Sequence, residues 1–163
     1  MTLVIRPFVP TDHATVMELW CTAWEAVYPQ IDFRARWPVM LERWDEMMAA
    51  GSLAHVAIAH LAPRDLARAA DDPTSGEIAG FTVLDPQNAT LDQIAVATCH
   101  WGSTVARALM LHAKTLSPRG LTLTVNQTNA RAVRFYEREG FVRLGEGVNP
   151  RSGMPVWEYR WGG

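Results

Sequence analysis

Two successive stretches near the N-terminus carry apolar residues at helical spacing. The first follows Thr11, which can cap a helix, and stops at Pro29, while the second stops at Gly51. Since positions three and four residues apart share one face of an α-helix, each stretch predicts one amphipathic helix. The apolar positions are Val16, Leu19, Trp20, Ala23, Trp24 and Val27 in the first stretch, and Trp37, Met40, Leu41, Trp44 and Met47 in the second.

Short apolar segments bounded by Gly, Pro, Asp and Asn predict strands along the rest of the chain. Residues 62–76 are rich in Ala, Pro, Asp and Arg, which is typical of a mobile loop, and residues 66–68 within them could form one helical turn. The predicted strands span residues 3–8, 53–61, 78–84, 90–97, 121–125, 141–144 and 155–161.

Two further helices are predicted over residues 102–116 and 129–138. The resulting order is β-α-α-β-β-β-α-β-α-β-β, which predicts an α/β fold around a mixed sheet. The sequence has no internal repeat and no linker that would divide it, and 163 residues suit one domain. We therefore expect residues 1–163 to form a single domain.

Composition narrows the classes of protein to consider. The formal net charge is −2 and no basic run occurs, which argues against nucleic-acid binding. The N-terminus does not resemble a signal peptide, and no apolar run is long enough to span a membrane. The two cysteines, Cys21 and Cys99, lack CxxC spacing and are expected to be free thiols. We expect a soluble, cytoplasmic protein.

The strand and helix between residues 91 and 109 are joined by a short polar loop, and the helix begins with small residues. The N-terminus of a helix offers unpaired backbone N–H groups and the positive end of the helix dipole, so it binds phosphate without a basic side chain. Gly102 and Ala106 would let a diphosphate approach the backbone. Taken alone, an ordinary strand-to-helix turn explains the same pattern.

A second segment, residues 123–141, supports the ligand-binding interpretation. Ala132, Phe135 and Tyr136 fall on one face of a short helix, which Gly140 ends. Asn129 stands at the start of this helix, where its side chain could cap the helix or meet a ligand.

The two segments read IAVATCHWGSTVARALM and VNQTNARAVRFYEREGF. They resemble the two acetyl-CoA-binding motifs of the GNAT superfamily, the GCN5-related N-acetyltransferases of bacterial type. The segment AWEAVYP also resembles the substrate-side helices of that family. The resemblance implies a mostly antiparallel sheet of about seven strands flanked by four helices, acetyl-CoA as cofactor, and acetyl transfer to a primary amine of a small molecule, a peptide or a protein.

The chain departs from the family pattern in the phosphate loop. Trp101 stands where Arg or Gln is usual, and Thr104 replaces a glycine. Backbone donation survives both changes. The resemblance implies cofactor-binding roles for Ile94, Ala95, Val96, Trp101, Gly102, Ser103, Thr104, Val105, Ala106, Asn129, Ala132, Phe135 and Tyr136.

Acetyl transfer to an amine requires that the amine lose a proton and that the thiolate gain one. The phenol of Tyr136 is the candidate general acid, and a core aromatic is the alternative interpretation. Asp92 is the candidate base, with Glu77 and Asp85 as weaker candidates and a solvent-facing carboxylate as the alternative. Substrate binding is assigned to Trp24, Tyr28 and Asp92, although aromatic residues at helical spacing also suit a core.

The sequence also allows other sites and functions to be considered. The five histidines show no metal-ligand spacing, so no metal site is expected. A catalytically silent acyl-CoA-binding module is the main alternative function. A nucleotide-binding protein is disfavoured because neither a Walker motif nor GxGxxG occurs. Trp157 and Trp161 could serve packing or a homodimer contact.

Overall fold

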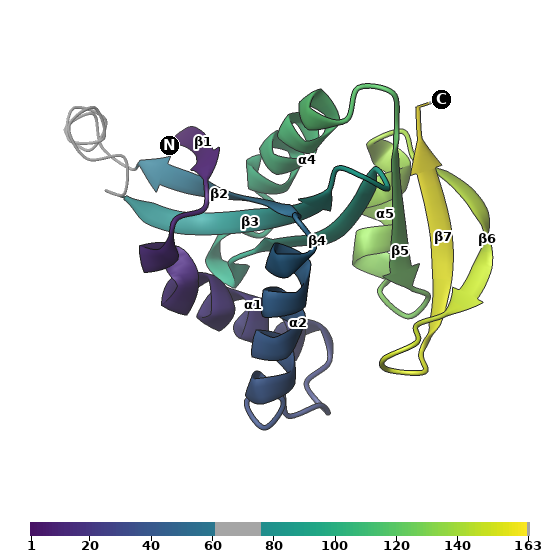
Figure 1. Ribbon diagram of the computed structural model, residues 1–163, viewed down its shortest axis with the longest axis horizontal. Helices are drawn as coiled ribbons and strands as arrows, with labels where there is room; N and C mark the ends of the chain where they lie inside the picture. Colours follow the sequence, from purple (N-terminus) through teal and green to yellow (C-terminus); the bar gives the residue numbers. More distant parts are fainter. Residues whose placement is uncertain (61–75, 163) are drawn as a thin grey trace.

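The computed structural model describes residues 1–60 and 76–162. These residues form one seven-stranded sheet with strand order β1-β2-β3-β4-β5-β7-β6 and helices on both faces (Figure 1). The strands are β1 (Thr2–Pro7), β2 (Leu53–His60), β3 (Glu77–Asp85), β4 (Thr90–Val96), β5 (Leu121–Asn126), β6 (Val142–Val148) and β7 (Pro155–Trp161). The helices are α1 (His13–Val27), α2 (Trp37–Ala49), α4 (Val105–Leu116) and α5 (Ala130–Arg138), with 3-10 turns η1 (Pro10–Asp12) and η2 (Thr98–His100).

The element order predicted from the sequence is confirmed, and the sheet is mostly antiparallel. The predicted loop at 62–76 and its helical turn fall almost entirely on residues 61–75, outside the described residues. Two helix starts differ from the prediction. The helix expected from Gly102 begins at Val105, because residues 101–104 form turns.

The first helix also starts differently from the sequence-based expectation, in which Thr11 is the cap. The helix begins at His13, after the 3-10 turn η1. The Asp12 carboxylate accepts a hydrogen bond from the Val9 backbone N–H at 2.9 Å and two from the Arg6 guanidinium at 2.7 and 2.8 Å. This buried ion pair joins the end of β1 to the beginning of α1.

Helices α1 and α2 cover one face of strands β2 and β3, and α4 covers the other face (Figure 1). The apolar stripes predicted from the sequence supply the first of these cores, in which Trp20 and Trp44 pack against Phe81 at ring-centroid distances of 6.1 and 6.0 Å. A separate cluster joins α4 and α5 to the C-terminal strands. Trp157 and Trp161 pack against this C-terminal cluster.

The sheet divides between β4 and β5. These two strands are parallel, and they pair only at Thr90 and Thr122, near their first residues. Every other pair of neighbouring strands is antiparallel and pairs over six or seven positions. Beyond Thr90 the edge of β4 therefore faces β5 without being bonded to it, and β5, β7 and β6 form a second group of strands (Figure 1).

Strand β4 contains a β-bulge at the same place. The register against β3 shifts between the pairs Val83–Gln93 and Leu84–Leu91, which leaves Asp92 without an opposite residue. At a bulge, two consecutive side chains can point to the same face of the sheet instead of to opposite faces. Asp92 and Gln93 thus both lie on the face covered by α1 and α2, where Arg43 contacts Asp92 and Gln93 borders a cavity with Trp20.

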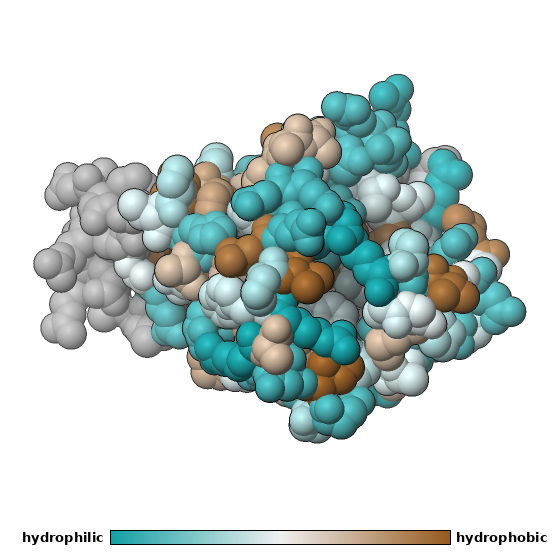
Figure 2. Space-filling model, turned by 60° about the horizontal axis from the view of Figure 1, so that its bottom comes forward, coloured by the Kyte–Doolittle hydropathy of each residue, from teal (hydrophilic) through white to brown (hydrophobic). Residues whose placement is uncertain are grey.

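Figure 2 shows the molecule from the side of α1 and α2, where hydrophobic side chains lie in small patches among hydrophilic ones. None of the helices in the described residues is both long and apolar enough to cross a membrane. Cys21 is buried and Cys99 is exposed, and both are free thiols, as expected.

Candidate active site

The free edge of β4 presents backbone groups toward the division in the sheet. The Ala97 N–H donates to the Ala79 carbonyl of β3 at 2.9 Å. Because the N–H and C=O of successive residues in a strand point to opposite sides, Ala95 also turns its polar groups to β3, while Ile94 and Val96 turn theirs toward β5. Of the three strand residues expected to contact the cofactor, Ile94 and Val96 therefore turn their backbone groups to the unpaired edge, and Ala95 turns its groups to β3.

Trp101 is folded back over this edge. Its indole Nε1 donates a hydrogen bond to the Val96 carbonyl at 2.9 Å. The Arg131 guanidinium carbon lies 3.8 Å from the centroid of the Trp101 ring. The loop before α4 is thereby joined both to β4 and to the first turn of α5. The sequence indicated neither contact, because each links residues from different elements.

The N–H groups that precede α4 divide into engaged and free donors. The N–H groups of Trp101 and Ser103 donate to the carbonyls of Thr98 and His100, both at 3.2 Å, and Val105 donates to the Ser103 hydroxyl at 3.3 Å. Within the described parts of the chain, no acceptor is bonded to the N–H groups of Gly102, Thr104 or Ala106. The expected set of donors from Trp101 to Ala106 is thus reduced to alternate residues.

Gly102 and Thr104 leave this loop open. Gly102 has a φ of +81°, and a Cβ added to it would meet no atom within 4 Å. Thr104 is exposed at the start of α4 and makes no side-chain capping bond. The free N–H groups and the positive end of the helix dipole therefore face accessible space, which suits an anionic group.

Asn129 caps α5, which was one of the two roles that the sequence allowed for its side chain. Its side-chain oxygen accepts a hydrogen bond from the Ala132 N–H at 3.2 Å. The side-chain amide nitrogen has no partner in the described part of the chain, so Asn129 retains a donor for a ligand. Ala132 and Phe135 are half-buried and pack against the C-terminal cluster.

Tyr136 lies in that cluster, packed between Phe135 and Phe141 at ring-centroid distances of 5.5 and 5.8 Å. Only 8% of the residue is exposed, and burial raises the pKa of its hydroxyl above the ordinary value. Among the described residues, that hydroxyl has no hydrogen-bond partner. Its oxygen nevertheless keeps some contact with solvent, unlike the fully buried polar atoms without a partner. It is therefore protonated at neutral pH and free to donate.

Asp92 is held by α2. One Arg43 nitrogen lies 3.3 Å from an Asp92 carboxylate oxygen, and the Asp92 side chain is 20% exposed. Burial raises the pKa of Asp92, the Arg43 charge opposes this rise, and Asp85 adds to it. The weaker candidate Asp85 is engaged instead in its own turn, where it accepts hydrogen bonds from Gln87 and Asn88.

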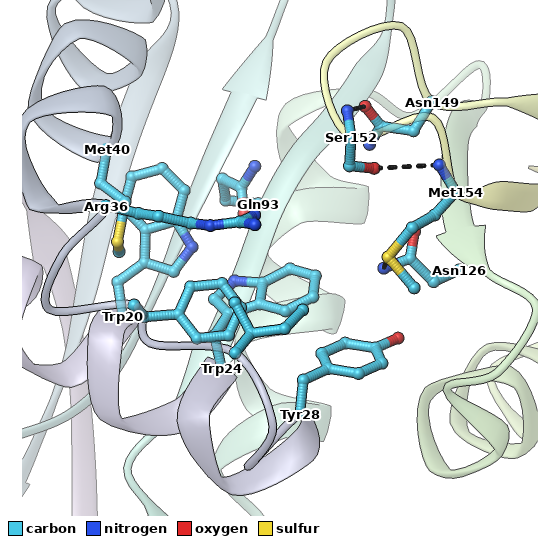
Figure 3. Close-up of a pocket in the computed structure, with 12 residues that line it drawn as sticks. Trp20, Trp24, Tyr28, Arg36, Met40, Gln93, Asn126, Asn149, Ser152 and Met154 are labelled. Atoms are coloured by element: carbon cyan, nitrogen blue, oxygen red, sulfur yellow. Dashed lines mark hydrogen bonds between the residues drawn. The ribbon is translucent and has the colours of Figure 1, made fainter.

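A cavity of about 160 Å³ opens between α1, α2 and the divided strands (Figure 3). Trp24 and Tyr28, expected at the substrate site, both line it, whereas Asp92 does not. Tyr28 also reaches across the division, with its hydroxyl 3.2 Å from the Thr128 hydroxyl. The apolar walls are Trp20, Trp24, Tyr28, Ile31, Phe33, Met40 and Met154, and the polar lining residues are Arg36, Gln93, Asn126, Asn149 and Ser152.

Most polar residues of the cavity lining could not be predicted from the sequence. Gln93 and Asn126 come from the two diverging strands, and Asn149 comes from the turn between β6 and β7, so they meet only in the folded chain. The fold also brings ligand atoms of Glu77, Cys99 and His100 within 4.8 Å of one another, a grouping that the spacing of the histidines did not indicate.

The family model for the acetyltransferase (GNAT) domain matches residues 28–161. This chain belongs to the GNAT acetyltransferase family. The match includes both diverging strands, the loop before α4 and helix α5. The chain is thus an N-acetyltransferase, and the expectation of acetyl-CoA as its acetyl donor is confirmed by the family.

Solved GNAT structures share the fold at low sequence identity. The chain is similar to apo YjaB from Escherichia coli, with 23% identity, a TM-score of 0.71 and full coverage of both chains. It is also similar to PaiA N-acetyltransferase from Thermoplasma acidophilum in complex with coenzyme A, with 18% identity, a TM-score of 0.72, and coverage of 99% of this chain and 100% of that one.

A third GNAT structure is spermidine N-acetyltransferase from Vibrio cholerae in complex with CoA and spermine. It is 19% identical to this chain, with a TM-score of 0.66 and coverage of 98% of this chain and 94% of that one. No match to this chain was found among curated protein sequences.

Proposed function

We propose that this GNAT enzyme acetylates the primary amine of a small molecule bound in the aromatic cavity, by direct attack of the amine on the thioester of acetyl-CoA. The observation that carries the proposal is the division between β4 and β5. Beyond Thr90 it leaves the edge of β4 without a strand partner, with the Val96 carbonyl bonded to Trp101, and strand residues Gln93 and Asn126 border the cavity on the two sides of the division. Donor and acceptor would meet where the strands separate.

The chain offers a set of groups that fits the acetyl donor. Ile94 and Val96 would present backbone groups to the pantetheine arm, and the N–H groups of Gly102, Thr104 and Ala106 would hold the diphosphate at the start of α4. The Asn129 amide would donate to the cofactor from α5. PaiA and spermidine N-acetyltransferase, which have the same fold, are described with CoA bound.

Tyr136 would act as the general acid. Bound acetyl-CoA supplies an activated acyl group whose transfer leaves a thiolate. A phenol that burial keeps protonated, and whose hydroxyl has no partner in the described residues, can give its proton to that sulfur. Tyr136 lies on α5 one helical turn beyond Ala132, which would pack against the cofactor in this proposal.

Asp92 would accept the proton of the amine. A free alkylamine has a pKa of about 10.4 and must lose a proton before it attacks. Asp92 immediately precedes Gln93, which borders the cavity, so a water molecule could connect the carboxylate to the amine. Arg43 would hold that carboxylate in place. A homodimer and a cytoplasmic location remain predictions.

Release of free thiol from acetyl-CoA across a panel of amines tests the proposal, with wild type, Tyr136→Phe and Tyr159→Phe. We expect Tyr136→Phe to lower kcat by about 100-fold while the Kd for acetyl-CoA is unchanged, since general acid catalysis contributes about 10²–10⁴-fold. Tyr159→Phe is the control, because that buried hydroxyl is bonded to Glu137 at 2.8 Å. It should leave kcat within about twofold.

Two outcomes would overturn parts of this function. If Tyr136→Phe weakens acetyl-CoA binding as much as it slows turnover, Tyr136 is a packing residue and not the acid. If the wild type binds acetyl-CoA but none of the amines in the panel causes thiol release, the chain is a silent acyl-CoA-binding module.

A further inference from the structure

We infer that the acceptor carries an anionic group close to its amine, as an apolar or aromatic α-amino acid does, and that Arg36 binds this group. The inference rests on the proposed function, because it assigns the substrate class of the same cavity. It follows from the charge of the cavity lining and from the side chains of Arg36 and Gln93, which make no ion pair or hydrogen bond with the described residues.

The wall formed by α1 and the segment after it suits a flat apolar group. The Trp24 and Tyr28 rings are stacked, with centroids 5.6 Å apart and an angle of 17° between their planes. The Phe33 ring also packs against Trp24, with ring centroids 5.9 Å apart. Such aromatic surfaces gain free energy by burying apolar or aromatic ligand atoms.

The charge of the lining excludes a polycation as the preferred acceptor. Of the described residues that line the cavity, none carries a carboxylate, and Arg36 is the one with a full charge. A polyamine such as spermine, which is bound in the Vibrio cholerae structure, presents several ammonium groups that acidic side chains would have to neutralise. Here the corresponding charges would be repelled by Arg36.

Arg36 also differs from its neighbours in having no counter-ion. Arg34, two residues earlier, is bonded to Glu18, and Arg43 is paired with Asp92. The Arg36 side chain makes neither an ion pair nor a hydrogen bond with any described residue. Figure 3 shows it extending from the beginning of α2 toward Gln93, so its guanidinium is available to a ligand in the cavity.

The remaining polar lining residues are mostly engaged. The Asn149 side-chain oxygen accepts hydrogen bonds from the N–H groups of Arg151 and Ser152, and the Ser152 hydroxyl accepts one from Met154. The Gln93 amide has no such partner in the described structure. Asn126 donates to the Met154 sulfur at 3.7 Å. Arg36 and Gln93 are thus the polar lining residues whose side chains make no hydrogen bond with the described residues. A guanidinium is the preferred partner of a carboxylate, which it can bind through two parallel hydrogen bonds.

The position of Gln93 sets the distance between the acceptor's anion and its amine. Gln93 directly precedes Ile94, whose backbone faces the division in the sheet where the thioester would lie. The end of the cavity toward which Arg36 extends is thus also the end nearest the acyl group. An anion held there leaves room for a reacting amine only a few bonds away, as on the α-carbon of an amino acid, with the apolar side chain against Trp24 and Tyr28.

A matched set of acceptors tests the inference: L-phenylalanine, L-phenylalanine amide, 2-phenylethylamine and spermidine. Binding of each is measured by calorimetry in the presence of CoA, and turnover is measured by thiol release. For the wild type we expect the Kd of L-phenylalanine to be at least about tenfold lower than those of the amide and the amine. Removing a charged hydrogen-bond partner from a ligand typically weakens its binding by at least about this factor. Arg36→Gln should abolish that ratio.

Arg34→Gln is the control variant, because it removes the same charge from the same loop but from a residue outside the lining. It should preserve the preference for L-phenylalanine. Equal affinity for L-phenylalanine and 2-phenylethylamine, tighter binding of spermidine, or an unchanged preference in Arg36→Gln would each overturn the inference. Because binding is read directly, a carboxylate preference without thiol release would contradict the proposed function and leave the assignment of Arg36 standing.

Discussion

The Arg131 guanidinium is stacked on the Trp101 indole, with its central carbon 3.8 Å from the ring centroid. Arg131 belongs to the first turn of α5, and Trp101 to the loop before α4, so the contact joins the two segments that the sequence indicated as cofactor-binding. Trp101 stands where the family usually has Arg or Gln. The stack holds the guanidinium of Arg131, from α5, against the Trp101 side chain of this loop.

A double-mutant cycle on this pair should reveal a coupling of about 0.5–1 kcal/mol in the free energy of unfolding, as expected for a cation over an indole face. The variants are Trp101→Ala, Arg131→Ala and the double mutant, measured by urea denaturation. Arg138→Ala, which alters the last residue of the same helix, should show no coupling to Trp101→Ala. Additive effects of Trp101→Ala and Arg131→Ala would mean that the stack adds no stability.

Asn129 allows helix capping to be separated from cofactor binding. Asn129→Ala removes both the cap to Ala132 and the free amide, and should cost about 1 kcal/mol of stability as well as affinity. Asn129→Asp retains the capping oxygen but replaces the amide donor with a negative charge. It should keep the stability of the wild type and weaken acetyl-CoA binding about tenfold or more. Unchanged affinity in Asn129→Asp would exclude the proposed contact.

A side chain at position 102 is predicted to weaken acetyl-CoA binding, because it would occupy the open space beside the loop. Gly102→Ala places a Cβ in the open region before α4, at a φ of +81° that costs about 1–2 kcal/mol for a residue with a side chain. Gly51→Ala is the matched control, since its φ is +85° and its Cβ would meet only Gln87 at 3.9 Å. Both variants should lose similar stability by thermal denaturation, but only Gly102→Ala should raise the Kd for acetyl-CoA. Equal affinity in the two would remove Gly102 from the site.

The pKa of Asp92 should respond to Arg43 in a defined direction. Burial raises this pKa and Arg43 opposes the rise, so Arg43→Ala should raise it further. The acidic limb of kcat/KM would then move to higher pH, because the base must be deprotonated. The same pKa affects stability. Because the pKa of Asp92 is higher in the folded than in the unfolded state, protonated Asp92 stabilises the fold at pH values below its unfolded-state pKa, and this stabilisation is lost as the pH rises through its folded-state pKa.

Carbon-13 NMR titration of the Asp92 carboxyl group, together with pH–rate profiles, measures this shift. Glu46→Gln is the control, since it removes the other carboxylate near Arg43, at 3.9 Å, and leaves the Asp92 contact in place. It should not move the limb upward. If Arg43→Ala leaves the limb where it is in the wild type, Asp92 is not the base.

The sequence predicted the fold well because the fold is encoded locally. The stripe containing Val16 and Trp20 and the short apolar strands are patterns within single elements, and the resemblance at residues 91–142 supplied their arrangement. The cap at Asn129 was foreseen for the same reason, since it depends on a residue three positions away.

The cavity was predictable only in part. Trp24 and Tyr28 were named because they lie close together in the segment AWEAVYP, whereas Arg36, Gln93 and Asn126 become neighbours only when α2, β4 and β5 converge. The bulge that turns Asp92 toward Arg43 was also hidden, because a one-residue register shift depends on the partner strand and not on β4 alone. The acid role of Tyr136 was proposed from the motif and a core position was the alternative, but the packing of Tyr136 beside Phe141 could be seen only in the fold.

The thermal stability of the chain with and without acetyl-CoA tests the central claim most directly. A ligand that binds only the folded state at a concentration 100 times its Kd stabilises it by about 2.7 kcal/mol, which for a domain of this size raises Tm by about 5–10 °C. We predict a shift of this size for the wild type with acetyl-CoA, and a smaller one for Gly102→Ala at the same concentration. The absence of any shift with millimolar acetyl-CoA would contradict cofactor binding at the division between β4 and β5.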